Sequence, residues 1–411
     1  MRAAAAIAVA LVVATAYAGE PAGRTVVVLL YDGFAPSLID AFQPPTLATL
    51  RAEGAWTHHL VPVFPTISHP NQTSISTGCW PEHHGIVSNR FLDPERGPYE
   101  HSRDADWLIG CEYLNVVAER QGVRTAALGW VGRYSRTRGE LATHTSKEPV
   151  FADFPSVEAR TDEVVHLLER SPATRPQLIL AYFPEPDRSE HFHGMTADAT
   201  AGAVAASDAS IGRILAALRR LDDATLIVTT DHGMIPVTTN VNVTKILANH
   251  RIHARALSDG TTSFLYFDDP AERERAVTEL AAYTQFDVVR REAQPVSWHL
   301  GTSARVGDLI LSARPPYFIQ DIERWPPWAQ WLGSWGPELL WAEPALKAGH
   351  GYPPETPGVQ GMLYAWGSGI AVGREVDAIR VIDVHPTVTH LLGIASGTPV
   401  DGTVARGLLA P

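Results

Sequence analysis

The segment RTVVVLLYD, residues 24–32, decides the fold of this chain. Its uninterrupted β-branched and aliphatic residues predict a strand that is buried on both faces of a sheet. QLILAYF at 177–183 and ATLIVTT at 224–230 have the same character, and residues 123–130 predict a fourth strand. Helical patterns lie between and after these strands, at residues 45–53, 156–170, 197–221 and 383–392. The expected fold class is therefore α/β, with a largely parallel central sheet covered by helices on both faces.

Composition limits the class of protein. The chain has 411 residues, of which 45% are hydrophobic, a fraction typical of a folded protein and too high for a disordered one. This length allows one large α/β domain with an insertion. The formal net charge of −12 argues against a nucleic-acid polymer or an anionic membrane as partner. A small anionic substrate remains compatible with it, because a bound metal can reverse the local field.

The pattern of elements changes between residues 249 and 346. A strand at 262–267, a helix at 270–283 and a strand at 308–312 predict a small inserted α+β subdomain there. Residues 19–248 and 347–411 would then form the main domain. The subdomain also holds a tryptophan-rich segment, for which local packing is the favoured interpretation and a substrate flap or lipid-facing patch the alternative. Its members are Trp325, Trp328, Trp331, Trp335 and Trp341.

The N-terminus predicts export. Met1-Arg2 precedes an apolar run at residues 3–15 and an A-x-A cleavage site at 16–18, so residues 1–18 are expected to be a cleaved signal peptide. The apolar run is shorter than the roughly 20 residues of a membrane span, and no later stretch is expected to span. The mature protein is expected to be periplasmic or secreted. The short Ala-rich signal favours a bacterial source. Cys79 and Cys111 would meet an oxidising environment, where they can pair or stay as buried thiols. The oligomeric state is not indicated.

Each of three predicted strands leads into an aspartate. Asp32 follows the first strand directly, Asp231 follows the strand at 224–230, and Asp187 follows the strand at 177–183 within a few residues. The carboxyl ends of parallel strands line the functional crevice of such a sheet, so these carboxylates are expected to converge. A single aspartate at such a place would mean little, because aspartate is common at turns and helix starts.

Histidines accompany the aspartates. His191 lies four residues after Asp187, on the same face of a helical turn, and His232 directly follows Asp231. His350 stands between two glycines, which allow a tight turn. Imidazole and carboxylate together are the ligands of zinc and similar divalent ions. The six residues predict a dinuclear metal centre with three ligands for each ion.

A hydroxyl nucleophile is expected in the segment FPTISHPN, residues 64–71. Ser68 and Thr66 are both candidates, since either precedes a small polar stretch at 72–77 that is expected to be helical. Backbone donors at a helix start and a nearby metal can lower the pKa of such a hydroxyl. A helix N-cap is the alternative role of either residue.

Taken together, the motifs resemble the nucleotide pyrophosphatase/phosphodiesterase family of the alkaline phosphatase superfamily. They occur in the order of that family and span nearly the whole mature chain. The motifs are YDG at 31–33, FPTISHPN at 64–71, TGCWPEHHGIVSN at 77–89, EPDRSEH at 185–191, DHGM at 231–234, HGY at 350–352, and DVHP at 383–386 with LLGI at 391–394.

The resemblance implies an alkaline-phosphatase-like catalytic core with two zinc ions. Asp187, His191 and His350 would hold one ion. Asp32, Asp231 and His232 would hold the other, with Ser68 directed toward it as the nucleophile. Asn89 matches the asparagine that donates to a phosphoryl oxygen, and attack by Ser68 would give a phosphoseryl intermediate. Manganese, iron or cobalt would also suit these ligands.

The chain departs from the family pattern beside the nucleophile. Ser68 replaces the usual threonine, which keeps the hydroxyl. His69 stands where nucleotide-cleaving members usually carry phenylalanine, and Ile67 where many carry lysine, so a preference for nucleotides is weakened. The residues expected to bind substrate are His69, Asn89, Tyr182 and Tyr352.

The expected function is an exported, metal-dependent phosphodiesterase or pyrophosphatase acting on nucleotides, nucleotide sugars or phospholipid head groups. A phosphomonoesterase or phosphonate hydrolase on the same core is an alternative, but a monoester needs one more neutralising group, and the sequence around Ser68 offers no arginine. A non-catalytic secreted metal-binding protein is the other alternative. Cys79-Trp80-Pro81 matches part of the sulfatase motif but lacks its arginine.

Overall fold

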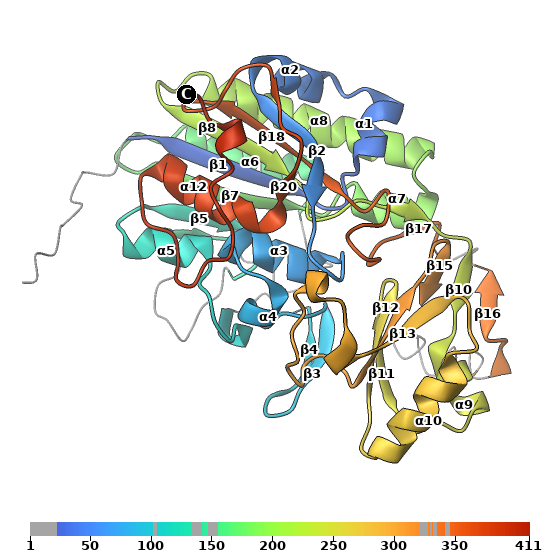
Figure 1. Ribbon diagram of the computed structural model, residues 1–411. Coiled ribbons are helices and arrows are strands. Elements are labelled where there is room, and N and C mark those ends of the chain that lie inside the picture. Colours follow the sequence, from blue (N-terminus) through green and yellow to red (C-terminus); the bar gives the residue numbers. More distant parts are fainter. Residues whose placement is uncertain are drawn as a thin grey trace, which may run out of the picture.

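A nine-stranded sheet forms the centre of the main domain (Figure 1). The computed structural model describes residues 23–101, 105–132, 142–146, 155–319, 328, 331, 335–341 and 346–411. In spatial order the strands are β19 (Arg374–Glu375), β2 (Ala55–Val61), β18 (Gly361–Gly367), β8 (Ala224–Thr229), β1 (Thr25–Tyr31), β7 (Leu178–Phe183), β5 (Thr125–Leu128) and β6 (His144–Thr145), with β20 (Ile379–Arg380) also beside β2.

The sheet is largely parallel, as predicted. Strand β1 lies between β7 and β8 and is parallel to both, and β5 continues the parallel arrangement beyond β7. The four strands predicted for the main domain are these four central ones. Strand β18 runs antiparallel to β8 and β2, and neither β18 nor β2 was predicted. Strand β2 carries His58 and His59 among its apolar residues, which hides its strand character.

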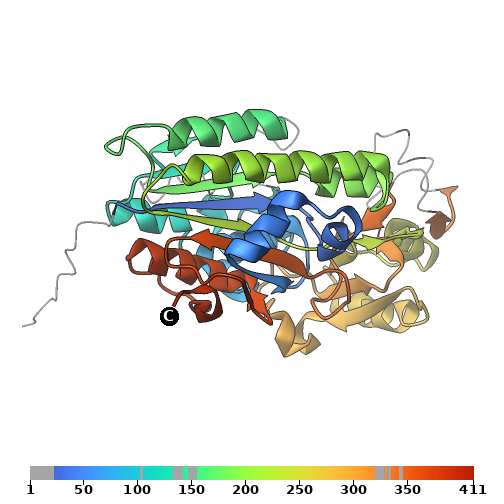
Figure 2. The same ribbon diagram turned by 90° about the horizontal axis from the view of Figure 1, so that it is seen from above.

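Successive residues of β1 face opposite layers of the core. Val26, Val28 and Leu30 pack with one set of helices, whereas Val27 and Leu29 pack with the other. Figure 2 shows the two layers of helices on either side of the sheet. One layer contains α3 (Ser68–Thr77), α5 (Leu114–Arg120) and α12 (Val384–Leu392); the other contains α1 (Pro36–Phe42), α2 (Pro45–Glu53), α6 (Val157–Leu168) and α8 (Asp198–Leu218). The four helices predicted for the main domain are α2, α6, α8 and α12, and the expected α/β class with helices on both faces is confirmed.

Helix α8 modifies one expectation about membranes. By length and composition it could cross a bilayer, although no such stretch was expected after the N-terminus. Half of its most apolar window is buried, and it packs against α6 and β8 in the core. This is the environment of a core helix, which passes the same test of length and composition.

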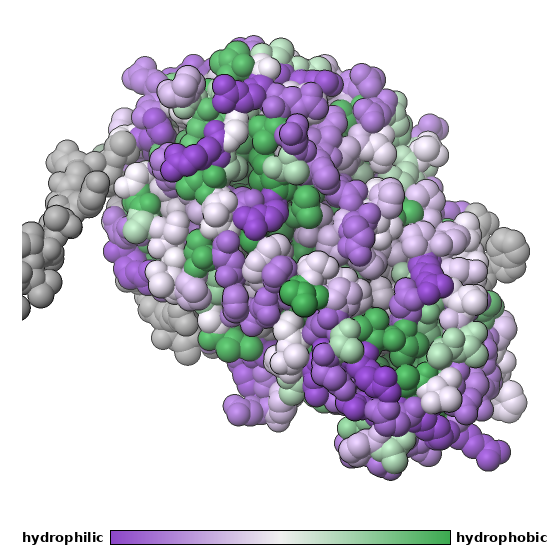
Figure 3. All heavy atoms as spheres, viewed as in Figure 1, coloured by the Kyte–Doolittle hydropathy of each residue, from purple (hydrophilic) through white to green (hydrophobic). Residues whose placement is uncertain are grey.

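A second region carries its own antiparallel sheet and core. Its strands and helices lie at the lower right of Figure 1, and hydrophobic residues gather over β12 and β13 on the face shown in Figure 3. The sheet has the order β11 (Arg255–Asp259), β12 (Thr262–Tyr266), β14 (Leu309–Ala313) and β13 (Phe286–Arg290), accompanied by α9 (Val243–Asn249) and α10 (Pro270–Leu280). Smaller pairings are formed by β15 (Tyr317–Ile319), β10 (Thr239–Val241) and β16 (Leu339–Trp341), by β9 (Ile235–Pro236) with β17 (Ala348–Gly349), and by β3 (Arg90–Asp93) with β4 (Gly97–Glu100).

This second sheet lies inside the predicted subdomain, residues 249–346. Its hydrophobic cluster also includes Val241 and Tyr352, which lie just outside those limits. The cluster therefore joins the insertion to the segments that precede and follow it. The boundaries at 249 and 346 stay a prediction.

Three tryptophans of the tryptophan-rich segment lie at the surface. Trp328, Trp331 and Trp335 are 68%, 62% and 75% exposed, so packing against the core does not explain them. The rings of Trp331 and Trp335 lie 6.1 Å apart. Trp325 lies outside the described residues, as does the side chain of Trp341.

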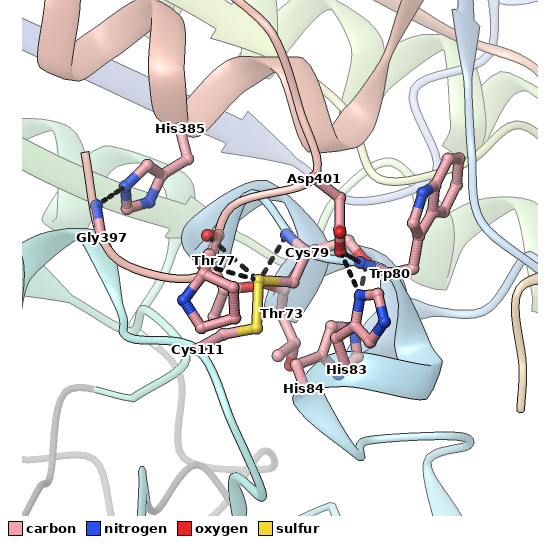
Figure 4. The surroundings of a disulfide bond; sticks show 12 residues. Thr73, Thr77, Cys79, Trp80, His83, His84, Cys111, His385, Gly397 and Asp401 are labelled. Atoms are coloured by element: carbon pink, nitrogen blue, oxygen red, sulfur yellow. Dashed lines mark hydrogen bonds and ion pairs between the residues drawn. A yellow bond between two sulfur atoms is a disulfide. The ribbon is translucent and has the colours of Figure 1, made fainter.

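Cys79 and Cys111 form a disulfide (Figure 4). It joins the end of α3 to the segment that leads into α5, two parts of the chain 32 residues apart. The pairing decides between the two states that the sequence left open. It also removes Cys79 as a sulfatase-type nucleophile, because that role needs a free thiol for conversion.

Two histidines in the core predict acid sensitivity. His84 and His385 are fully buried, and burial lowers the pKa of His84 to about 3 and that of His385 to about 4. Each ring accepts a hydrogen bond from a backbone N–H, of Ile86 and Gly397 respectively, which protonation would break. The folded state therefore favours the neutral rings. The resulting stabilisation is complete above the unfolded pKa of about 6.5 and is lost as the pH falls below it.

The free energy of unfolding should accordingly drop by about 2 kcal/mol for each ring between pH 7.5 and pH 5. Denaturant titrations at the two pH values measure this. A His385→Gln variant should be less stable at pH 7.5 but lose less on acidification. An equal loss in the variant and the unsubstituted protein would show that His385 is not responsible.

Candidate active site

The three aspartates predicted at strand ends meet at one edge of the central sheet. Asp32 follows β1 and Asp231 follows β8, the neighbouring strand, while Asp187 begins α7 (Asp187–His193) after β7. The backbone N–H of Asp187 donates to the carbonyl of Asp32 at 3.0 Å. Gly33 allows this close approach, because it has φ +68° and a Cβ there would lie 2.8 Å from the Cβ of Asp187.

The first predicted ligand group is Asp187, His191 and His350. Asp187 Oδ1 lies 3.3 Å from His191 Nε2 and 3.4 Å from His350 Nε2. The two imidazole nitrogens are 3.1 Å apart. Helix α7 brings Asp187 and His191 together at i, i+4, and β17 positions His350 directly after its last residue. The structure thus brings these three side chains together, and their role as metal ligands stays a prediction.

The second predicted group is Asp32, Asp231 and His232. His232 Nε2 lies 3.3 Å from Asp32 Oδ1 and 3.8 Å from Asp231 Oδ1. The His232 ring stacks on that of His350 at 3.7 Å, so the two groups adjoin. By mutual distance His232 can join either group, since its ligand atom lies within 4.8 Å of those of Asp187 and His350 as well as those of Asp32 and Asp231.

The hydrogen bonds of the three imidazoles fit metal ligands. In each ring Nδ1 contacts a backbone carbonyl: Ala348 for His191, Thr66 for His350 and Gly233 for His232. A carbonyl only accepts, so each Nδ1 must carry the proton. In neutral rings each Nε2 then presents a lone pair toward the site, and those of His191 and His350 face each other. A divalent cation satisfies such lone pairs, and fixing a histidine through its other nitrogen is usual around metals.

The charge states of Asp187 and His350 suit metal ligands, whereas the Asp187 carboxylate outweighs the effect of burial on His191 and raises the pKa of that ring. Burial alone would raise the pKa of Asp187, but His191 and His350 hold it below its ordinary value. Burial, reinforced by His232, lowers the pKa of His350 well below its ordinary value. Asp187 Oδ1 is buried and faces the Nε2 atoms of His191 and His350. An ionised carboxylate and a neutral imidazole that converge in the interior suit a bound cation.

The hydroxyl of Ser68 lies at this edge of the sheet. Ser68 is the first residue of α3 and is partly exposed, and its Oγ lies 3.3 Å from His232 Nε2. Thr66, the other candidate nucleophile, is fully buried. Its Oγ1 donates to the carbonyl of Tyr352 and accepts from the backbone N–H of Gly351, so it joins two segments of the chain.

Asn71 has a supporting role that the sequence analysis missed. Its amide nitrogen donates to the carbonyls of Val63, Pro65 and Ile67, and its oxygen accepts from the backbone N–H of Val63. One buried side chain therefore holds the loop that precedes Ser68. An asparagine one turn into a helix that follows a Pro-containing loop is a weak signal, since nothing local indicates its partners.

Asn89 keeps a donor group for a ligand, whereas His69 is engaged with Tyr99. Asn89 Oδ1 accepts from the backbone N–H of His69 at 2.7 Å, which leaves its NH2 group as the end that can donate to a ligand. His69 is buried, and its Nδ1 is bonded to the hydroxyl of Tyr99 on β4. The His69 ring also lies edge-on to His101, at 5.3 Å between centroids. His69 therefore packs against Tyr99 of the β3–β4 hairpin and against His101.

Tyr182 and Tyr352, two residues expected to bind substrate, lie inside the protein. Both are at most 1% exposed. The hydroxyl of Tyr352 donates to the carbonyl of Tyr317, and that of Tyr182 donates to Asp32 Oδ2 at 2.5 Å. Tyr182 therefore contacts a proposed metal ligand, whereas the Tyr352 hydroxyl is engaged with the backbone of β15. Gln72, which the sequence analysis did not single out, also contacts Asp32 and Asp231.

The chain is similar to proteins that are described as phosphodiesterases and pyrophosphatases. A family model described as type I phosphodiesterase / nucleotide pyrophosphatase matches residues 26–353. An uncharacterized pyrophosphatase/phosphodiesterase of Schizosaccharomyces pombe is 27% identical over 93% of this chain and 80% of its own length. The bis(5'-adenosyl)-triphosphatase enpp4 of Xenopus laevis is 24% identical over 92% of this chain and 80% of its own.

Solved structures give the same fold. Murine ectonucleotide pyrophosphatase/phosphodiesterase 5, solved as an inactive threonine-to-alanine variant in complex with AMP, has a TM-score of 0.82 to this chain. The match covers 94% of this chain and all of the murine one, at 20% sequence identity. At this identity the likeness concerns the fold.

Proposed function

The chain belongs to the type I phosphodiesterase / nucleotide pyrophosphatase family of metal-dependent hydrolases, and from this premise we propose how it acts and on what. It is an exported enzyme that hydrolyses phosphodiester or phosphoanhydride bonds at a two-zinc site, with Ser68 as nucleophile. The observation that carries the proposal is the meeting of two buried ligand groups at His232, whose Nε2 lies 3.3 Å from Ser68 Oγ. A nucleophile beside two such groups suits in-line displacement at phosphorus.

The residues of the chain divide the work of the reaction. Ser68 loses its proton as Oγ bonds to phosphorus, the bond from phosphorus to the leaving-group oxygen breaks, and a proton is taken up by that oxygen. Water then attacks the same phosphorus and releases Ser68 with its proton restored. Asn89 donates from its NH2 group to a phosphoryl oxygen, where charge develops. The bound ions lower the pKa of the Ser68 hydroxyl and stabilise the charge on the phosphoryl oxygens.

Zinc is the proposed metal, because the ligands mix three imidazoles with carboxylates. Asp187, His191 and His350 hold one ion. Asp32, Asp231 and His232 hold the other. The same donor set suits manganese, iron or cobalt, and metal analysis of the purified protein distinguishes them.

Charge around the nucleophile favours a diester over a monoester. Arg90, which follows Asn89, is paired with Glu100, and the buried Arg305 is paired with Asp93. These guanidinium groups are therefore engaged with carboxylates. A monoester brings one more negative charge to the site, for which a neutralising group would be needed. A phosphomonoesterase or phosphonate hydrolase remains the second candidate function.

Candidate substrates are nucleotides, nucleotide sugars and phospholipid head groups. The Xenopus relative is named for cleaving a dinucleoside triphosphate, and the murine structure holds AMP, which supports nucleotides. The buried His69, bonded to Tyr99, replaces the aromatic side chain that nucleotide-cleaving members usually present. Small phosphoesters and not nucleic-acid polymers are the proposed substrates, in keeping with a net charge of −12.

Export rests on two features of the chain. Residues 1–18, the predicted signal peptide, lie outside the described residues. The disulfide between Cys79 and Cys111 supports an oxidising compartment, a periplasm or the cell exterior. A non-catalytic metal-binding protein is disfavoured, because the site keeps all six ligands and an accessible hydroxyl.

The test compares two synthetic esters with zinc-loaded protein. We expect kcat/KM for bis-p-nitrophenyl phosphate to exceed that for p-nitrophenyl phosphate by at least about tenfold, a difference of about 1.4 kcal/mol in transition-state stabilisation. The zinc-loaded Ser68→Ala protein is the blank. A ratio below one would overturn the diester assignment. No hydrolysis of either ester, with two zinc ions bound, would favour the non-catalytic alternative.

A further inference from the structure

Gln72 contacts both carboxylates of the second ligand group. Its Nε2 donates to Asp231 Oδ2 at 2.8 Å and to Asp32 Oδ2 at 3.3 Å. The side chain is buried, at 1% exposure. Gln72 lies four residues after Ser68 on α3, so both residues lie on the same face of this helix. The helix that presents the nucleophile thus also bridges two proposed metal ligands.

Tyr182 completes the support of Asp32 from the sheet. Its hydroxyl donates to Asp32 Oδ2 at 2.5 Å, the same oxygen that Gln72 contacts. In the β1–β7 register Tyr182 pairs with Leu30, and Leu30 lies two residues before Asp32. The hydroxyl therefore arises from the strand beside β1. Two donors from different elements, a helix and a strand, converge on one carboxylate oxygen.

The arrangement divides the oxygens of Asp32 between two roles. Oδ2 accepts from Tyr182 and Gln72, whereas Oδ1 lies 3.3 Å from His232 Nε2, in the second ligand group. We propose that Gln72 and Tyr182 are positioning residues of this group: two neutral donors that fix Asp32 and Asp231 so that their ligand oxygens converge with His232. The inference rests on the proposed function, which assigns these carboxylates to a metal.

Neutral donors have a physical advantage at this place. Two buried carboxylates repel each other, and hydrogen bonds from an amide and a phenol offset part of that repulsion. A lysine or arginine would do the same but would bring a positive charge that competes with the metal. Donors beyond the ligands typically change metal affinity by about 10- to 100-fold when removed.

The test measures zinc binding to Tyr182→Phe and Gln72→Met, which remove the donor groups at nearly constant volume. Zinc is titrated against a competing chelator, so that affinity is read without activity. We expect one of two zinc equivalents to bind about 10- to 100-fold more weakly in each variant. At subsaturating zinc kcat should fall more than KM rises, and excess zinc should restore part of kcat.

Tyr31→Phe is the matched control. Tyr31 is also a buried strand tyrosine, but its hydroxyl donates to Ser210 Oγ at 2.8 Å, in the layer that contains α8. It should lose stability in denaturant titrations, as Tyr182→Phe does, and keep both zinc equivalents at unchanged affinity. This separates a general loss of a buried hydrogen bond from a loss of metal positioning.

Two results have different consequences. Unchanged affinity for both zinc equivalents in Tyr182→Phe and in Gln72→Met would overturn the positioning role and leave the proposed function intact. Failure of the unsubstituted protein to bind two zinc ions would instead overturn the two-metal site of the proposed function, and it is observed without any variant.

Discussion

Replacing Ser68 with alanine is expected to lower kcat for a diester by roughly 10³-fold or more. Ser68 Oγ is the hydroxyl that lies 3.3 Å from His232 Nε2, and without it no phosphoseryl intermediate forms. The six proposed metal ligands are untouched by the change. Zinc content should therefore stay at two equivalents per chain. Steady-state kinetics and metal analysis of the same preparation measure both quantities.

Two further variants sharpen this result. Ser68→Thr keeps the hydroxyl and should retain measurable turnover. Ser74→Ala removes another hydroxyl of α3, one that contacts His84 away from the metal ligands, and it should leave kcat within a few-fold of the original. Near-normal turnover in Ser68→Ala would end the assignment of the nucleophile. Thr66 would not readily replace it, since its hydroxyl is already engaged with Tyr352 and Gly351.

The fold was predictable where the sequence pattern and the environment agree. The strands that became β1, β7 and β8 lie in the middle of the sheet, with helices on both faces, so their residues are apolar throughout. Aspartates at the ends of these strands follow from the parallel arrangement, and the structure brings Asp32, Asp187 and Asp231 together. The local spacing of His191 and His232 relative to these aspartates predicted two further candidate ligands, and the structure places both beside the aspartates.

Other elements left no clear pattern in the sequence. Strand β2 lies between β18 and the short strands β19 and β20, and it carries the partly exposed His58 and the exposed His59. Strand β18 runs antiparallel to β8 and is formed by residues 361–367, far along the chain from β8. Such a partnership depends on contacts between segments more than a hundred residues apart, which local periodicity does not encode.

The supporting residues of the site were the hardest to predict. Tyr182 looks like any aromatic residue of a buried strand, and its position in the sequence does not show that its hydroxyl reaches Asp32. Gln72 and Asn71 are adjacent on α3, yet one contacts two proposed metal ligands and the other holds the loop before Ser68. Their roles depend on which way the helix faces, and that is set by tertiary packing.

Removal of the metal ions is expected to abolish activity and also to destabilise the fold. Without them the Nε2 atoms of His191 and His350, 3.1 Å apart, would face each other as lone pairs, and Asp32 and Asp231 would repel each other in the interior. A chelator should therefore lower the midpoint of thermal unfolding, and a metal present at 100 times its Kd stabilises a fold by about 2.7 kcal/mol.

Readdition of zinc should restore both quantities together, whereas calcium should not, because it prefers a shell of oxygen ligands. Chelation leaves the disulfide intact. If stability and turnover do not return when zinc is added back, aggregation of the metal-free protein is therefore the explanation. A chelated protein with unchanged stability and unchanged turnover would contradict the metal assignment. Loss of turnover without loss of stability would mean that the imidazoles of His191 and His350 move apart once the ions leave, so that their close approach costs the metal-free protein nothing.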